Sequence, residues 1–488
     1  MATPIPKNAA PFSIAEIVLA TRGEIIKSGE LRVTGVSTDT RSVSSGELFV
    51  ALKGDKFDAH DHVRAAVERG ASAVLVSRAV DAPADTTVIR VRDTLGALGD
   101  LAAAHRARWA HRGYSSNRRI VAITGSAGKT TTRHAVGRAL AALVGSENAV
   151  HTSRGNLNNA IGVPMTLFGL EAAHRYAVVE IGMNQPGEIR RGAEVVRPDA
   201  AAVTLVADAH TEGVGSIWGV LREKSEVFSY LGGGAVAVAN ADDEMARASL
   251  VHAGGARRIL YGSSPDADVR LVGRRALGLG GSALSIEVRY GSAPVLEIEA
   301  TVPLLGRAGV YASLASVALA IGLGVERARD GAALASALAS LGDNEAGRLA
   351  ARERSDGTVV IDDAYNANPA SMKASIEAAR EIASSLGRPL VLVLGSMFEL
   401  GPRSEELHED VGRAAADAKP RAVVAVGALA TALARGAESS GAHVVVAADA
   451  SAAESVVAGI IAAGDVVLVK ASNSLGLHRV AAQLLAQS

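Results

Sequence analysis

Short apolar runs alternate with alanine-rich stretches along most of the chain. The runs at 120–124, 201–206, 390–394 and 466–470 have the length and residue types of buried strands. The stretches between them have the length and composition of α-helices. Strands that alternate with helices are typical of parallel sheets with helices on both faces. The pattern therefore predicts an α/β protein of the doubly wound class.

The pattern changes character twice along the chain, and this predicts three domains. Residues 1–91 carry short strands, a turn-rich segment at 35–54 and a helix near 61–69. Residues 92–340 open with a helix and continue as strands that are each followed by polar residues. Residues 341–488 form a second α/β series. A length of 488 residues, at roughly 150 residues per domain, agrees with this division.

Two stretches depart from the regular alternation. Between 266 and 305, apolar and polar residues alternate one by one, which predicts antiparallel strands within or beside the middle domain. The uncharged run at 308–325 has the length of a membrane span, but it is mostly Ala, Gly and Ser, so we expect a buried helix. The first residues do not resemble a secretory signal. We therefore expect no membrane insertion and a cytoplasmic location.

The composition excludes several classes of function. Lys and Arg number 50 and Asp and Glu number 51, a net charge of −1, so no chain-wide basic surface exists and we expect no nucleic-acid partner. The absence of cysteine excludes thiolate metal sites, iron–sulfur clusters and cysteine nucleophiles. Only 3% of the residues are aromatic, which argues against stacking on single-stranded nucleic acid.

The most specific motif is a glycine loop between a predicted strand and a predicted helix. The loop reads Gly125-Ser126-Ala127-Gly128-Lys129-Thr130, and Thr131 follows it. The glycines let several backbone N–H groups converge, and the helix N-terminus adds positive charge, so the loop can bind phosphates. Lys129 supplies a charge for the β- and γ-phosphates, and the Thr130 hydroxyl can bind Mg²⁺. Ile123 stands where the longer phosphate-loop pattern has glycine, so this is a shorter G-x-x-G-K-T form.

Polar residues follow three more predicted strands. After the strands at 176–179, 201–206 and 235–239 come Glu180, Asp208, His210, Asn240 and Asp242. Since the carboxyl ends of parallel strands meet at one edge of a sheet, we expect these side chains near the glycine loop. Glu180 and His210 are candidate ligands, direct or through water, for Mg²⁺ held by nucleotide phosphates. On spacing alone, Lys224 is predicted to be a solvated lysine on a helix.

Taken together, these residues resemble those of the Mur ligases, ATP-dependent amide-forming enzymes of peptidoglycan synthesis. The resemblance spans nearly the whole chain and includes TGSAGKTTT at 124–132. It implies a small α/β UDP-substrate-binding domain at 1–91, a central ATP-binding ligase domain with a small antiparallel sheet at 92–340, and a Rossmann-like domain at 341–488. It also implies ATP and two Mg²⁺ ions as cofactors, with a carbamylated Lys224 holding the second ion.

Two segments indicate a position within the family. GNLNNAIGVP at 155–164 and DDAYNANPASM at 362–372 resemble the members that add D-alanyl-D-alanine to UDP-N-acetylmuramoyl-tripeptide. The resemblance implies these two small molecules and ATP as partners, an acyl-phosphate intermediate and a monomeric enzyme. LGSMFELG at 394–401 is also similar, with Ser396 in place of the family's Asp.

The resemblance also implies roles for individual residues. The implied catalytic residues are Lys129, Lys224, His210, Asn158 and Arg348. The implied ATP-binding residues are those of the loop from Gly125 to Thr131, with Asn240, Arg348 and Asp363. The implied metal ligands are Thr130, Glu180 and His210. The implied UDP-substrate residues are Thr38, Asp39, Thr40 and Arg41, and the implied acceptor-side residues are Asn366 and Asn368.

Some positions depart from the family pattern, and they keep alternatives open. Where the family has G-x-H-N-x-x-N near the adenine, the chain has Ala308, Gly309 and Ala312 in place of the His and both Asn. The usual KGSR segment reads KASN at 470–473. One alternative is another ligase of this kind, including folylpolyglutamate synthase. A second is a nucleotide-binding homologue without ligase activity, and a more distant third is a mechanical or DNA-directed ATPase.

Overall fold

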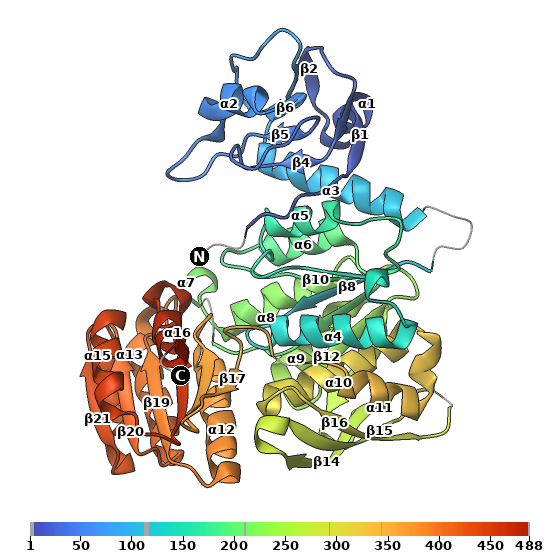
Figure 1. Cartoon of the computed structure of the whole chain (residues 1–488). Coiled ribbons are helices and arrows are strands. Elements are labelled where there is room, and N and C mark those ends of the chain that lie inside the picture. The colour runs from blue at the N-terminus through green and yellow to red at the C-terminus, as the bar shows by residue number, and fades with distance from the viewer. Residues whose placement is uncertain (1–3, 112–116, 209–210, 292, 343, 487–488) are drawn as a thin grey trace.

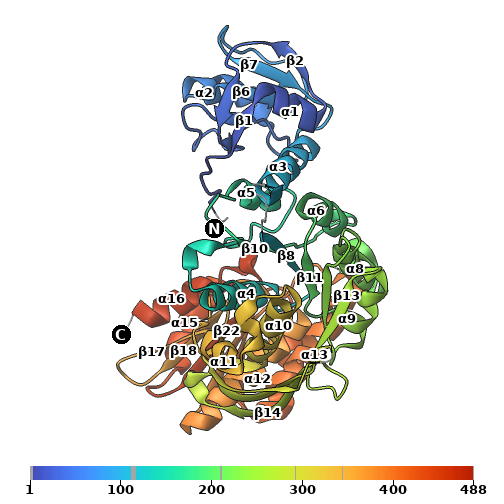
Figure 2. The ribbon, with the colours of Figure 1, turned by 90° about the vertical axis from the view of Figure 1, so that its right-hand side faces the viewer.

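The computed structural model describes residues 4–111, 117–208, 211–291, 293–342 and 344–486. These residues form three α/β units along the chain, each built on its own sheet. Figures 1 and 2 show the N-terminal unit at one end of the molecule, away from the C-terminal unit, with the middle unit joining them. The doubly wound α/β class predicted from the sequence is confirmed. The exact domain boundaries stay predictions.

The N-terminal unit contains a five-stranded sheet of order β2-β7-β6-β5-β4. Strand β2 is antiparallel to β7, and the other neighbours are parallel. The bounds are β2 Glu24–Lys27, β4 Val36–Ser37, β5 Leu48–Val50, β6 Ala73–Val76 and β7 Thr87–Arg90. A two-stranded sheet and two helices complete the unit: β1 Pro11–Ser13, β3 Arg32–Thr34, α1 Ile14–Thr21 and α2 Val63–Glu68.

Helix α3 (Thr94–His111) joins the N-terminal unit to the middle unit. It packs on α1 from one unit and on α5 (Gly162–Phe168) and α6 (Glu188–Val196) from the other. Its apolar residues are buried in a core cluster that contains side chains of both units, among them Phe12 and Phe168. Because a shared apolar core costs free energy to separate, this contact stabilises the relative position of the two units.

The middle unit contains a nine-stranded sheet of order β16-β15-β14-β13-β12-β11-β8-β10-β9. The predicted antiparallel strands are present, and they extend this sheet beyond its parallel part. The parallel part comprises β8 Arg119–Thr124, β9 Val150–Thr152, β10 Tyr176–Glu180, β11 Ala200–Val203, β12 Val236–Asn240, β13 Arg257–Gly262 and β14 Val269–Ala276. The antiparallel extension comprises β15 Ser282–Val288 and β16 Leu296–Val302.

Helices cover both faces of the middle sheet. One face packs against α4 (Lys129–Val144), α10 (Gly306–Gly322) and α11 (Gly331–Ala339). Helix α10 contains most of the long uncharged run, and its side chains are largely buried against α4 and the sheet, as predicted. The remaining helices of the unit are α7 Thr211–Val214, α8 Ile217–Ser225 and α9 Glu244–Ser249. None of the helices in the described ranges is long and apolar enough to cross a bilayer.

The C-terminal unit contains a six-stranded sheet of order β17-β18-β22-β19-β20-β21, in which only β17 is antiparallel to its neighbour. The strands are β17 Ala350–Glu353, β18 Val359–Asp363, β19 Leu390–Gly395, β20 Ala422–Val426, β21 His443–Ala447 and β22 Val466–Lys470. Helices α12 Pro369–Leu386, α13 Ser404–Asp417 and α14 Ala430–Ala437 bury one face. Helices α15 Ala450–Ile460 and α16 His478–Ala486 bury the other.

The middle and C-terminal units meet beside the glycine loop. Helix α10 of the middle unit contacts α12 of the C-terminal unit. Arg274 of β14 forms an ion pair with Glu381 of α12, with 2.7 Å between Nη2 and Oε2. The chain crosses between the two units through residues 341–342 and 344–349, which we call the linker. This arrangement brings the loop after the carboxyl end of β8 next to the segment that follows β18.

Candidate active site

The glycine loop connects β8 to α4, as the sequence predicts. Gly125 has a φ of +153°, and a Cβ at this position would lie 2.0 Å from Thr204 Oγ1. Gly128 has a φ of +81° and caps the N-terminus of α4. A side chain is therefore excluded by contact at Gly125 and disfavoured by backbone conformation at Gly128. The Thr204 hydroxyl also donates to Ala127 O at 2.6 Å, which fixes the loop against the segment after β11.

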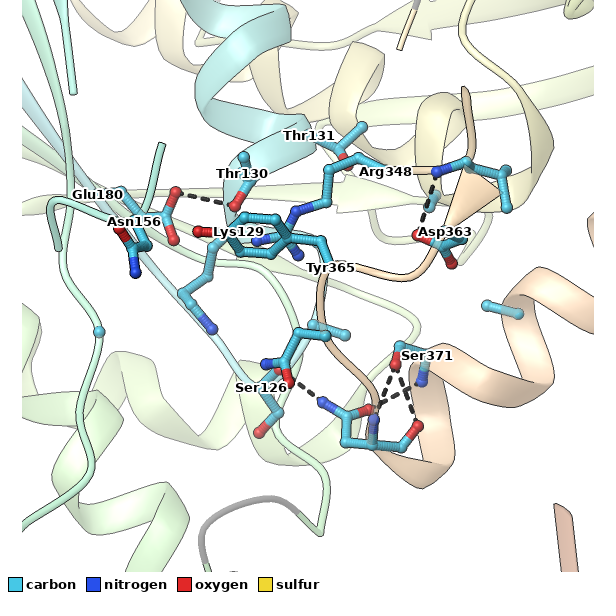
Figure 3. Close-up of a pocket in the computed structure, with 18 of the residues that line it drawn as sticks. Ser126, Lys129, Thr130, Thr131, Asn156, Glu180, Arg348, Asp363, Tyr365 and Ser371 are labelled. Atoms are coloured by element: carbon cyan, nitrogen blue, oxygen red, sulfur yellow. Dashed lines mark hydrogen bonds between the residues drawn. The ribbon is translucent and has the colours of Figure 1, made fainter. Parts of the chain in front are cut away.

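A cavity of about 350 Å³ lies at this loop, between the middle and C-terminal units (Figure 3). This volume lies within the range of small-molecule sites, roughly 300–1,000 Å³. Most of the side chains that the sequence singled out meet here. They are Ser126, Ala127, Gly128, Lys129, Thr130, Thr131, Asn158, Glu180, Arg348, Asp363, Asn366 and Asn368.

Other predicted residues lie elsewhere. Asn240 does not line the cavity, and its Oδ1 accepts a hydrogen bond from Asp242 N at 3.0 Å within its own turn. Lys224 also lies outside the lining. Residues 38–41 belong to the N-terminal unit, where Arg41 forms an ion pair with Asp39 at 2.7 Å. His210 lies outside the residues that the structure describes.

Glu180, at the end of β10, has a carboxylate whose two oxygens both accept hydrogen bonds. It is 1% exposed. Its Oε2 accepts a hydrogen bond from Thr130 Oγ1 at 3.0 Å, and its Oε1 accepts one from Asn158 Nδ2 at 2.8 Å. The described residues include no group of three or more acidic or histidine side chains that could enclose a metal alone. Mg²⁺ usually binds one or two carboxylates and completes its shell with water and phosphate oxygens, so Glu180 and Thr130 fit such an ion.

Lys129 and Lys224 lie close enough to interact electrostatically. Lys129 Nζ donates to Gly125 O at 2.7 Å. Burial and the Arg348 cation lower the pKa of Lys129, although Glu180 acts in the opposite direction. Lys224 is 1% exposed, so the expectation from spacing alone that it is solvated was wrong. Burial, and then the neighbouring Lys129 cation, hold the pKa of Lys224 well below its usual range.

Arg348 enters the cavity from the linker. The next residue, Leu349, has a left-handed backbone with a φ of +56°, and its N–H donates to Asp363 Oδ1 at 3.1 Å. The other carboxylate oxygen of Asp363 accepts from Lys470 Nζ at 2.5 Å. The Arg348 guanidinium lies 4.0 Å above the centre of the Tyr365 ring. These contacts direct Arg348 toward the phosphate-binding end of the cavity (Figure 3).

Asn368 makes a direct contact between the two units. Its Oδ1 accepts from Ser371 N at 2.9 Å and caps α12. Its Nδ2 donates to Ser126 O of the glycine loop at 2.9 Å (Figure 3). The segment DDAYNANP is therefore bound to the glycine loop in this conformation.

Three segments of the chain match models of one protein family. Residues 32–106, 123–320 and 347–473 match the models described as Mur ligase family, catalytic domain; Mur ligase middle domain; and Mur ligase, glutamate ligase domain. The UDP-N-acetylmuramoyl-tripeptide–D-alanyl-D-alanine ligase of Escherichia coli (strain K12) is 37% identical, covering 85% of this chain and 86% of that protein. The chain belongs to the Mur ligase family.

Two further similar proteins align with almost the whole length of this Mur ligase. The ligase of the same name from Mycobacterium tuberculosis (strain ATCC 25618 / H37Rv) is 32% identical over 97% of each chain. A crystal structure of MurF from Acinetobacter baumannii superposes with a TM-score of 0.85 at 29% identity, covering 99% of this chain and all of that one. The family resemblance stated from the sequence is confirmed.

The cavity of this Mur ligase also contains residues to which the sequence analysis gave no role. They include Asn156, Asn159, Met183, Asn184, Asn344, Tyr365, Ser371 and Lys470. Lys470 ends β22 and lies opposite Asp363 of β18 in the parallel register. The position of Lys470 at the end of the apolar run VVLVK was the feature of the sequence that could have predicted it as a site residue. Asn344 lies in the linker, where no periodic pattern marks it.

Proposed function

We propose that this Mur ligase joins D-alanyl-D-alanine to the carboxylate of UDP-N-acetylmuramoyl-tripeptide, using ATP. The observation that carries the proposal is the contact of Asn368 with Ser126 O, because it joins the DDAYNANP segment to the glycine loop. Relatives of that name, up to 37% identical over most of the chain, support the same substrates. We propose that the enzyme acts as a monomer in the cytoplasmic stage of peptidoglycan precursor synthesis.

The cavity provides charge and position for a phosphoryl transfer. The tripeptide carboxylate attacks the γ-phosphate in line, and ADP leaves, which gives an acyl phosphate. The free amine of the dipeptide attacks the acyl carbon, so that an amide forms and phosphate and one proton are released. Lys129 and the loop N–H groups bind the phosphates from the middle unit, and Arg348 adds a cation from the linker. Catalysis of this kind depends mainly on positioning and charge stabilisation.

We propose Mg²⁺ as the second cofactor. Thr130 and Glu180 would hold the ion together with phosphate oxygens, and His210 is the third proposed ligand. When bound, Mg²⁺ neutralises negative charge on the transferred phosphoryl group. Asn158 keeps the Glu180 carboxylate oriented, because its amide donates to Oε1.

Lys224 is proposed to carry a carbamate that helps to hold a second Mg²⁺. A neutral amine reacts with carbon dioxide to form the carbamate and release a proton. Burial next to Lys129 favours the neutral amine of Lys224. The product is an anion beside the Lys129 cation, so the reaction replaces a neutral amine with a charge of opposite sign to that of Lys129.

The N-terminal unit is proposed to bind the UDP portion of the substrate. The side chain of Arg41 is 87% exposed and can turn from Asp39 toward a diphosphate. Thr38, Asp39 and Thr40 lie in the same turn after β4 and offer hydroxyl and carboxylate groups to a ribose.

The proposed function is tested by measuring ADP release while each substrate is omitted in turn. We expect ADP only when the tripeptide nucleotide, the dipeptide, ATP and Mg²⁺ are all present. ATP binding without turnover would instead support a homologue that lacks ligase activity. Turnover with an amino acid such as glutamate, but not with the dipeptide, would support a different ligase of the family.

A further inference from the structure

Arg133 is a buried arginine that contacts three other segments of the chain near the cavity. It lies on α4, one turn after Thr130, and is 3% exposed. Its Nη2 donates to both carboxylate oxygens of Glu345, at 2.7 and 2.8 Å. Its Nη1 donates to Ser153 O, and its Nε lies 3.4 Å from Glu180 Oε2. One guanidinium therefore joins α4, the loop after β9, the end of β10 and the linker.

Two of these partners hold cavity residues in place. Ser153 Oγ accepts a hydrogen bond from Glu180 N at 3.1 Å. Ser153 also begins the loop that leads to Asn156 and Asn158, which line the cavity. Arg133 thus contacts Glu180 directly and also binds the residue that fixes the Glu180 backbone.

Glu345 connects Arg133 to the linker. Up to this residue, the linker is bound to the middle unit: His134 Nε2 lies 2.9 Å from Leu341 O, and Asn344 Oδ1 accepts from Leu305 N at 3.2 Å. The Arg348 N–H donates back to Glu345 O at 2.9 Å.

Leu349, the last residue of the linker, is bound through its N–H to Asp363 of the C-terminal unit. Gly347, with a φ of +71°, forms the turn between the two parts. Arg348 therefore lies at the point where the chain passes from one unit to the other.

The electrostatics require Arg133 to remain between its partners. Glu180 is buried, and removal of its arginine partner would leave a buried charge with less compensation, which is strongly destabilising. Glu345 has the more exposed side chain of the two carboxylates, at 32%. The Glu345 contact is consequently the one that can break and re-form when the units move.

We propose that Arg133 is a positioning residue that couples the linker carrying Arg348 to the carboxylate of Glu180. The inference rests on the proposed function, since it describes how two parts of that site are aligned. When Glu345 is bound to Arg133, Arg348 and Glu180 face the same phosphates. When Glu345 is released, the linker loses its contact with Arg133, and Arg348 is no longer held in the cavity.

The primary test uses Glu345→Ala, because a partly exposed residue can be removed without leaving Glu180 uncompensated. We expect kcat to fall about tenfold or more, with the KM for the dipeptide and the melting temperature unchanged. Glu345→Gln keeps a hydrogen-bond acceptor and should recover part of the loss. The matched control is Arg138→Met with Glu147→Ala, an exposed ion pair 2.8 Å apart between Arg138 of the same helix and Glu147 beyond its end, which should leave kcat unchanged.

A second variant and a second readout separate coupling from simple loss of structure. Arg133→Met should lower kcat at least as much as Glu345→Ala, and the double variant should be no slower than Arg133→Met alone. In the ADP-bound protein, Glu345→Ala should speed amide hydrogen exchange at 344–349 about tenfold, and the Arg138 control should not.

Three results would overturn the inference: a Glu345→Ala kcat within twofold of wild type, multiplicative losses in the double variant, or unchanged exchange in the linker. The exchange measurement needs only ADP binding. If the wild-type protein fails to ligate, the proposed function fails, but the exchange result still decides whether Arg133 and Glu345 hold the linker.

Discussion

Lys224 is enclosed by protein, although its side chain carries a charge in water at neutral pH. The lowered pKa makes the amine available for carbamylation, and the proposed carbamate supplies a carboxylate that alanine lacks. We predict that Lys224→Ala lowers kcat by about 10²-fold or more and that formate or acetate restores part of it. The exposed neighbour Arg222 provides the control, since Arg222→Ala should keep the wild-type kcat. A fully active Lys224→Ala variant would show that the group is not needed.

His151 gives the fold a pH dependence that can be measured apart from activity. Burial, with a smaller contribution from His174, lowers the pKa of His151 from its usual value to about 4. The unfolded chain binds a proton near pH 6.5, but the folded protein does so only near pH 4. The stability that the neutral ring contributes is therefore full above pH 6.5 and is lost as the pH falls toward 4, by up to about 3 kcal/mol.

The variant His151→Gln tests this dependence. Glutamine can still donate to Thr166 O, the partner of His151 Nε2, but it does not titrate. We predict that urea unfolding of the wild type shows a loss of stability between pH 6.5 and 4 that is clearly smaller in the variant. Parallel curves for the two proteins over this range would contradict the assignment.

Single residues differ in how well the sequence predicts them. Lys129 and Thr130 were predictable because the loop, the preceding strand and the following helix are contiguous in the sequence. Glu180 was predictable because it ends an apolar strand. Arg133 was not, because its partner Glu345 lies 212 positions along the chain and a charged residue on a helix is normally solvated.

At the scale of elements, a single residue at the N-terminus of α12, Asn368, has two roles. Asn368 caps the helix through Oδ1 and binds the glycine loop through Nδ2. Asn368→Asp keeps a capping oxygen but loses the donor, so we predict an increased KM for ATP of about fivefold with little change in stability. Asn368→Ala should show the same increase and also lose about 1 kcal/mol of unfolding free energy. Equal KM values for wild type and Asn368→Asp would contradict the role of this contact.

Most strands were predictable because of where they lie in their sheets. The central strands are buried on both faces, so they form continuous apolar runs, as β19 and β22 do. Strands β15 and β16 have one covered face, and their burial alternates accordingly. Strand β17 was missed, since its sequence AARE at a sheet edge carries neither pattern.

At the scale of the whole molecule, residues of two units form the cavity, and we predict that these units separate when products leave. The absence of cysteine allows two introduced cysteines to be cross-linked selectively. Arg274 and Glu381 form an ion pair across the two units. We predict that Arg274→Cys/Glu381→Cys, joined by a short bis-maleimide, loses steady-state turnover by about tenfold or more but still binds ADP. Each single-cysteine variant treated with the same reagent should stay active, and full turnover of the cross-linked protein would exclude an opening motion here.

The number and type of the units could be predicted from the alternation of strands and helices, but their contacts could not. Which surfaces meet depends on side chains that are far apart in the sequence, such as Asn368 and Ser126. The family resemblance assigned both segments to one site, and the structure shows the bond between them.

The central claim is that the tripeptide carboxylate is phosphorylated by ATP and then captured by the dipeptide amine in this cavity. The most direct test is a ligation with ¹⁸O in the tripeptide carboxylate, followed by mass spectrometry of the nucleotide product and of the released phosphate. We expect a product extended by D-alanyl-D-alanine and one ¹⁸O in the phosphate for each amide formed. Phosphate without ¹⁸O, or ADP release without the extended product, would contradict it.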